Sequence, residues 1–299
     1  MNLIEIIVEI GTEEQKVLIV NELSILENAI KGLTTPLKTP VYKLVVPEEF
    51  DSTVNQIEGR ADYTSQREHF TLAKNAIDKD GISLIFSKLL YTDDHDFQTR
   101  FQTYAHELFH VVNRENYAKC SVDSVTTKQH HWNLQSLFDE YHVNRKSFEL
   151  CDTLLPAKTE RFNNHITTTA EGFAKIVSNP KHHSDLKQAI TTFRSNRDID
   201  VYLDKSCSIF RSVSMAISYT YAYLDHFDSL MDIKAMLETS KFINSKTAKL
   251  IDYFRLKYSD GDFDLSGGYK LMEDFMDNFG IHVVDKPEGR QYCYVVDVG

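Results

Sequence analysis

Residues 104–113 read YAHELFHVVN and contain the pattern HELFH, in which His106 and His110 are four residues apart and Glu107 follows the first histidine. On an α-helix, residues four apart lie one turn above each other on the same face, so the two imidazoles can bind one metal ion. Glu107 is rotated by about 100° from His106 around the helix. It therefore stays outside the pair of ligands but can reach a water molecule beside the metal.

The residues around this pattern favour a largely buried helix. TDDHD at 92–96 combines N-cap residues with acidic side chains, which predicts a helix from about Asp96 to about Asn113. Gly and Pro are absent from Ile82 to Leu155, so nothing interrupts this helix or a second one at about 132–151. Histidine and glutamate on a buried helix are costly unless they have partners, and a bound metal would provide one.

A catalytic metal site needs a third protein ligand, and the second helix offers Asp139, Glu140 and His142 within FDEYHVNR. Helical phase favours Glu140, because it shares the more apolar side of the helix, whereas Asp139 and His142 share the polar side. We therefore predict Glu140 as the third ligand, with Asp139 and His142 as alternatives. Asn144, one turn beyond Glu140, is placed either to hydrogen-bond a metal-bound histidine or to serve as an ordinary polar residue of the helix.

Two other histidine pairs are not assigned to a metal site. These are His130-His131 and His182-His183. Adjacent residues on a helix point about 100° apart, so neither pair forms a chelate by itself. We predict that both pairs lie in solvated loops, with the alternative that His130 or His131 borders the cleft because they precede the glutamate-bearing helix.

The chain as a whole divides into a mixed N-terminal part and a helical C-terminal part. Strands are predicted at 3–10 and 41–46, and DKDG at 78–81 separates two β-rich runs that indicate a hairpin. Periodic segments predict helices at about 165–178, 183–196, 205–238, 240–258 and 267–279, before a short terminal hairpin around 287–289. We expect an α+β fold with a mixed lobe at 1–115, which carries the HExxH helix, and a helical lobe at 116–299, or one compact unit because no linker separates them.

Composition disfavours several classes of partner. With 33 basic and 44 acidic residues the net charge is −11, which disfavours nucleic acid and anionic membrane surfaces. No apolar run approaches the roughly 18 residues that span a bilayer, and the N-terminus lacks the basic region of a signal peptide. Four widely spaced cysteines, without a CxxC pair, are expected to be reduced. We expect a cytoplasmic protein, and the sequence does not indicate its oligomeric state.

HELFH followed by a helix that carries Glu140 resembles the zincin metallopeptidases, in particular the gluzincins, whose third zinc ligand is a glutamate. The resemblance covers about 70–150. It implies one Zn²⁺ per chain, held by His106, His110 and Glu140, with Glu107 as the general base. It also implies a peptide or protein substrate that lies antiparallel to the edge strand before the motif helix. We assign that edge strand to Ile82, Ser83, Leu84, Ile85 and Phe86.

The sequence departs from two related patterns. The metzincin extension needs a glycine and a third histidine where this chain has Asn113 and Asn116, so that branch is excluded. The segment 139–144 reads DEYHVN and is not a close copy of the thermolysin-type NExxSD, which leaves the subfamily unassigned. Most gluzincins also stabilise the oxyanion with a Tyr or His of the C-terminal lobe, and no motif selects one among Tyr219, Tyr221, Tyr223, His226 and Tyr253.

These observations predict a zinc-dependent metallopeptidase that hydrolyses peptide or protein amide bonds. The zinc polarises the scissile carbonyl and supplies the water, while Glu107 takes the proton and delivers it to the leaving nitrogen. One alternative is a catalytically silent zincin scaffold that acts as a binding or regulatory module through its helical lobe. Another is a helical protein in which HExxH arises by chance.

Overall fold

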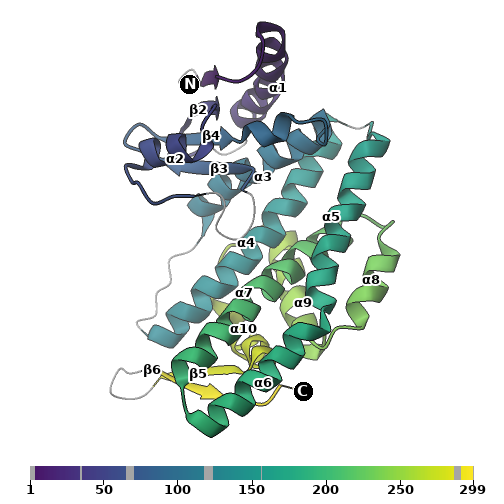
Figure 1. Ribbon diagram of the computed structural model, residues 1–299. Helices are drawn as coiled ribbons and strands as arrows, with labels where there is room; N and C mark the ends of the chain where they lie inside the picture. The colour runs from purple at the N-terminus through teal and green to yellow at the C-terminus, as the bar shows by residue number, and fades with distance from the viewer. Residues whose placement is uncertain are drawn as a thin grey trace. The chain divides into compact units, whose positions relative to one another are not determined.

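The computed structural model describes residues 4–33, 36–64, 71–117, 124–155, 157–285 and 291–298 (Figure 1). Helices make up about 66% of the chain and accompany a small mixed sheet, so the predicted α+β class is confirmed. The chain forms two compact units, Met1–Asn116 with Lys146–His165, and Tyr117–Arg145 with Ile166–Gly299. The division into lobes at 1–115 and 116–299, or one compact unit, stays a prediction.

The first unit contains a four-stranded sheet in the order β1-β2-β4-β3. β1 (Glu5–Val8) pairs in parallel with β2 (Val41–Val46), and β2 pairs in parallel with β4 (Ile82–Phe86). β3 (Ala73–Ile77) is antiparallel to β4, so the hairpin predicted around DKDG is confirmed. Gly81 in its turn has a φ of 145°, and a Cβ there would lie 2.5 Å from the carbonyl oxygen of Pro40. Only glycine fits this position without strain.

β4 is an interior strand of this sheet. It is hydrogen-bonded to β2 on one side and to β3 on the other, and all five of its residues are buried. The prediction that Ile82, Ser83, Leu84, Ile85 and Phe86 form the edge strand is therefore wrong, and the edge on this side is β3. A nearly continuous apolar run suits a strand that is covered on both faces. The AKNAI of β3, with a lysine and an asparagine, suits an edge.

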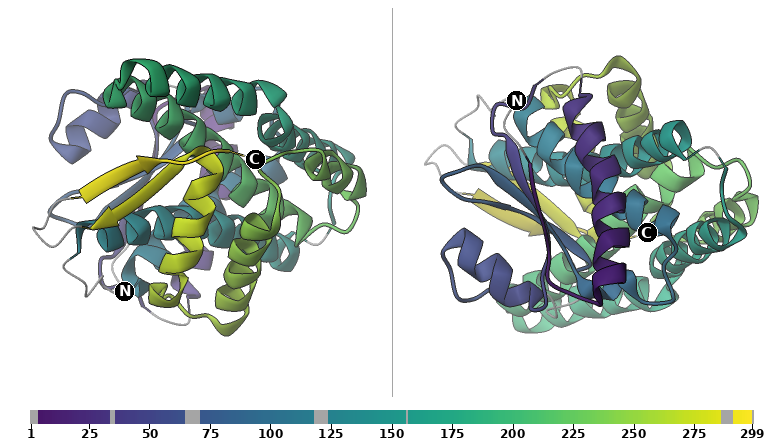
Figure 2. Two further views of the ribbon diagram at one scale, coloured as in Figure 1. Left: turned by 90° about the horizontal axis from the view of Figure 1, so that it is seen from below. Right: turned by 90° about the horizontal axis from the view of Figure 1, so that it is seen from above.

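Helices cover both faces of the sheet in the first unit. α1 (Glu13–Lys31) and α3 (Phe97–Asn116) contribute to a core on one face, whose buried residues include Leu23, Leu44, Leu84, Phe86, Tyr104 and Leu108. α2 (Phe50–Glu58) covers the other face with Phe50 and Val54, against Ala76 and Ile85. Figure 2 (right) shows α1 and α2 on opposite sides of the strands. The 3-10 helix η1 (Lys88–Tyr91) follows β4.

The motif helix α3 begins where the sequence predicts. Asp96 Oδ1 accepts a hydrogen bond from the backbone N–H of Thr99 at 2.9 Å, which is the expected N-cap interaction. Farther along the helix, Arg100 Nε donates to the Glu22 carboxylate of α1 at 2.9 Å. This partly buried ion pair adds to the apolar contacts that hold α3 in the first unit.

The helices of the second unit follow one another with short connections. α4 (Val125–Leu154) and α5 (Glu160–Ser178) each contribute residues to both units. The remaining elements are α6 (Pro180–Asn196), α7 (Ile199–Leu224), α8 (Met231–Glu238), α9 (Ser245–Asp260), η2 (Ser266–Gly268), α10 (Tyr269–Met276), η3 (Asp277–Phe279), β5 (Ile281–Asp285) and β6 (Gln291–Val295). β5 and β6 pair antiparallel, as predicted, and the predicted turn at 287–289 lies outside the described residues.

The predicted helix at 205–238 is interrupted in the structure. α7 ends at Leu224 and α8 begins at Met231. Asp225, at the end of α7, accepts hydrogen bonds from Tyr141 at 2.7 Å and from Arg255 at 2.8 and 2.7 Å. These contacts with α4 and α9 hold the chain in place at the end of α7. They join residues far apart in the sequence, so no local pattern predicts them.

The histidine pairs predicted to lie in loops are in helices, so that prediction is wrong. His130 and His131 lie in α4 and are only 4% and 6% exposed, and His182 and His183 lie partly buried in the first turn of α6. α4 begins earlier than predicted because Ser124 Oγ accepts the N–H of Thr127 at 3.0 Å and caps the helix. Among the described residues, no helix is long and apolar enough to cross a membrane.

Candidate metal centre

The two histidines of the HELFH pattern converge on one face of α3. Their Nε2 atoms are 3.0 Å apart, and the ring planes are inclined at 81°. A tetrahedral zinc ion with nitrogen ligands at about 2.0–2.1 Å holds those nitrogens about 3.3 Å apart. His106 and His110 therefore lie close to the separation that one metal ion requires, as their spacing on a helix predicts.

Glu140 joins these histidines in a group that could hold a metal ion. One ligand atom each of His106, His110 and Glu140 lies within 4.8 Å of the other two, and all three residues are partly buried. Two imidazole nitrogens with one carboxylate oxygen is a donor set that catalytic zinc sites use, with a fourth position left open. The chemistry of the three side chains thus fits a zinc ion. Neither Asp139 nor His142 belongs to the group.

The two alternatives to Glu140 have other surroundings in the second unit. Asp139 Oδ1 accepts a hydrogen bond from the Tyr117 hydroxyl at 3.2 Å. Burial, together with the negative charges of Asp139 and Glu140, raises the pKa of Tyr117, so this hydroxyl stays protonated and acts as a donor. His142 is 5% exposed and lies among three aromatic rings, with centroid distances of 5.6 Å to Phe138, 5.2 Å to Tyr258 and 5.0 Å to Phe263. Its predicted place on the polar side of the helix is therefore wrong.

Asn144 is buried one turn beyond Glu140 on α4. Its Nδ2 donates to the backbone carbonyl oxygen of Glu140 at 2.7 Å. One of the two side-chain amide protons of Asn144 is therefore donated to a carbonyl of its own helix. The role predicted for Asn144 beside a metal-bound histidine stays a prediction.

Glu107, the predicted general base, contacts a residue that the sequence analysis missed. Asn75 Nδ2 donates to Glu107 Oε2 at 3.0 Å, and Arg114 Nη2 donates to Asn75 Oδ1 at 2.5 Å. Asn75 lies at the middle of the edge strand β3, whereas Glu107 and Arg114 lie on α3. A single asparagine in a strand matches no motif, so only the contact between strand and helix identifies it.

The five candidates for oxyanion stabiliser occupy different environments in the second unit. Tyr223 is 3% exposed, and burial raises its pKa, which suits a core residue. Tyr219 stacks on Phe173 with centroids 4.5 Å apart, and Arg255 lies 5.7 Å from the ring of Tyr221. None of these contacts selects a stabiliser, so this role stays unassigned.

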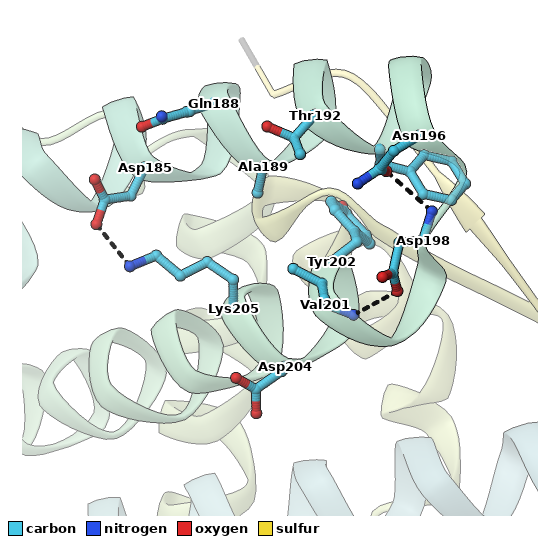
Figure 3. Close-up of a pocket in the computed structure, with 11 residues that line it drawn as sticks. Asp185, Gln188, Ala189, Thr192, Asn196, Asp198, Val201, Tyr202, Asp204 and Lys205 are labelled. Carbon is cyan, nitrogen blue, oxygen red and sulfur yellow. Dashed lines mark hydrogen bonds and ion pairs between the residues drawn. The ribbon is translucent and has the colours of Figure 1, made fainter.

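A cavity of about 300 Å³ lies between α6 and α7 (Figure 3). Its polar groups make structural contacts: Lys205 pairs with Asp185 at 2.9 Å, and Asp198 caps α7 through the N–H of Val201 at 3.1 Å. Tyr202 donates to the carbonyl oxygen of Gly280 at 2.6 Å. The residues described around this cavity include neither histidine nor cysteine, and we assign it no chemical role.

No protein-family model, curated protein or solved structure matches the chain.

Proposed function

We propose that the protein is a zinc-dependent metallopeptidase that hydrolyses peptide or protein amide bonds. In this proposal His106, His110 and Glu140 hold one Zn²⁺ per chain, and Glu107 is the general base. The observation that carries the proposal is the approach of one ligand atom from each of the three residues to within 4.8 Å of the others. The HELFH spacing alone provides two of those ligands and the base.

The chemistry divides between the metal and Glu107. A bound zinc ion would polarise the scissile carbonyl and make a water molecule nucleophilic near neutral pH. Glu107 would take the proton of the attacking water and deliver it to the leaving nitrogen, which a carboxylate does efficiently when it lies within hydrogen-bonding reach. Because Glu107 directly follows His106 on α3, it lies beside the pair of histidines without belonging to it.

The substrate would bind along the edge strand β3. The zincin resemblance implies that the substrate lies antiparallel to an edge strand, and in this sheet the edge on that side is β3. An extended peptide can add to such an edge through backbone hydrogen bonds. Because Asn75 at the middle of β3 contacts Glu107, a peptide bound along this edge would pass close to the general base.

The substitution Glu107→Gln tests the proposal. Zinc-loaded wild-type protein and the variant are incubated with a mixed peptide library, and the products are identified by mass spectrometry. We expect cleavage by the wild type and a loss of about 10²–10⁴-fold in the variant, with zinc content unchanged. Glu171→Gln on α5, whose side chain is 42% exposed and pairs with Lys175, provides the matched control and should cleave like the wild type.

Three results would contradict the proposal in different ways. Undiminished cleavage by the Glu107→Gln variant would remove Glu107 from the mechanism. Bound zinc without any cleavage by the wild type would indicate a silent scaffold. Failure of the purified wild type to bind zinc would eliminate the metal centre itself.

A further inference from the structure

We propose that Asn75 is a positioning residue for the general base: its amide, oriented by Arg114, holds the Glu107 carboxylate for proton transfer. This inference rests on the proposed function and adds a role for a residue outside the HELFH pattern. It depends on two hydrogen bonds, from Asn75 Nδ2 to Glu107 Oε2 at 3.0 Å and from Arg114 Nη2 to Asn75 Oδ1 at 2.5 Å.

The chemistry of the partners fixes the orientation of the Asn75 amide. A guanidinium group has only donors, so the atom of Asn75 that faces Arg114 must be the carbonyl oxygen. The amide nitrogen then faces Glu107, whose ionised carboxylate has only acceptors. A flipped amide would place two donors together at one end and two acceptors at the other. Arg114 therefore selects the orientation in which Asn75 donates to the base.

The spacing along α3 explains why a bridging residue is needed. Glu107 and Arg114 are seven residues apart, which places them on the same stripe of the helix but about 10 Å apart along its axis. That separation is too long for a direct ion pair. Asn75 reaches the stripe from β3 and connects the two side chains, so the strand that borders the proposed substrate also fixes the base.

This contact engages Oε2 of the Glu107 carboxylate, and in this proposal Oε1 accepts the proton. A charge-assisted hydrogen bond limits the rotation of the carboxylate. A reaction slows when the residues that orient its catalytic groups are removed. Mutation of the outer partners of a metal site typically lowers metal affinity or activity 10–100-fold. We expect Asn75 to contribute an effect of this size to kcat and little to KM.

The isosteric variant Asn75→Asp removes the donor and places a second carboxylate beside Glu107. Its carboxylate still accepts from Arg114 but cannot donate to Glu107. We expect kcat to fall about 10–100-fold while KM and bound zinc stay near wild-type values. In a Glu107→Gln background the same change should cause no further loss, because the two residues act as a unit. Asn278→Asp, which alters an amide that bonds Asn244 in the second unit, is the matched control and should leave kcat unchanged.

A measurement that does not depend on turnover tests the contact itself. Denaturant unfolding of metal-free wild type, Asn75→Ala, Glu107→Ala and the double variant forms a double-mutant cycle. We expect the double variant to be less destabilised than the sum of the single ones. Additive changes would overturn the inference, as would Asn75→Asp with wild-type kcat. If wild-type protein cleaves nothing while the cycle shows coupling, the proposed function fails, and Asn75 loses its catalytic role.

Discussion

At the scale of single residues, the candidate centre depends on three side chains whose chemistry and approach suit one metal ion. His106 and His110 follow from spacing on one helix, and their Nε2 atoms are 3.0 Å apart. Glu140 was selected by helical phase on α4, but in the structure it is its place in the group with the two histidines that separates it from Asp139 and His142. Asn75 has no such local signal, because its role arises only when β3 packs beside α3.

Substitution of the third ligand gives the first residue-scale prediction. Glu140→Ala should weaken zinc binding by more than the 10–100-fold that outer partners of a metal site contribute, because it removes a direct ligand. Asp139→Ala, at the preceding position of the same helix, is the control and should retain zinc. Isothermal titration calorimetry of both metal-free variants measures the difference. Equal affinities would contradict the assignment of Glu140.

A second residue-scale prediction concerns pH. Burial lowers the pKa of His130, although Glu273 and Asp285 oppose the shift. The unfolded chain therefore binds this proton at a higher pH than the folded chain does. The contribution of neutral, buried His130 to the free energy of unfolding is fully present above the ordinary histidine pKa of about 6.5. It decreases as the pH falls below that value. In urea unfolding at pH 7.5 and 5.5, His130→Gln should lose less stability between the two pH values than the wild type, and an equal loss would refute the prediction.

At the scale of elements, the β3–β4 hairpin decides where the edge of the sheet lies. Its turn was predictable, because Gly81 in DKDG is a local signal. The identity of the edge strand was not, because strand order depends on which distant strands pair. β4 pairs with β2, some forty residues earlier, and this non-local pairing moves the edge to β3.

The turn of this hairpin provides an element-scale prediction. Gly81→Ala should destabilise the protein by more than the 1–2 kcal/mol typical of a left-handed residue, because its Cβ would lie 2.5 Å from the Pro40 carbonyl oxygen. Gly59→Ala is the matched control, since Gly59 also has a positive φ of 64° but nothing within 4 Å of the added Cβ. Chemical denaturation of the two variants compares them. A cost at Gly81 no greater than at Gly59 would show that the turn relaxes.

The helices were predicted where their ends carry local signals. Asp96 caps α3, as the segment TDDHD predicts. The start of α4 and the break after α7 were missed, because Ser124 was overlooked as a cap and the contacts of Asp225 come from other helices. The burial of His130 and His131 was not predicted because the predicted helix began at about 132, after both histidines.

At the scale of the whole molecule, α4 belongs in part to each of the two compact units and carries Glu140. The α+β class followed from the sequence because strand and helix signals are strongly separated along the chain. His106, His110 and Glu140 could be named as candidate ligands because each lies on a predicted helix, and the structure brings the three together. What the sequence could not provide are the contacts between elements, including Asn75 with Glu107.

The most direct test of the central claim is anomalous diffraction at the zinc edge from crystals of the protein grown with zinc. We predict one zinc ion per chain, with His106 Nε2 and His110 Nε2 at about 2.0–2.1 Å and a Glu140 carboxylate oxygen at about 2.0–2.2 Å. A chain without zinc at these residues, or zinc held by the two histidines with Glu140 turned away, would contradict the three-ligand metal centre.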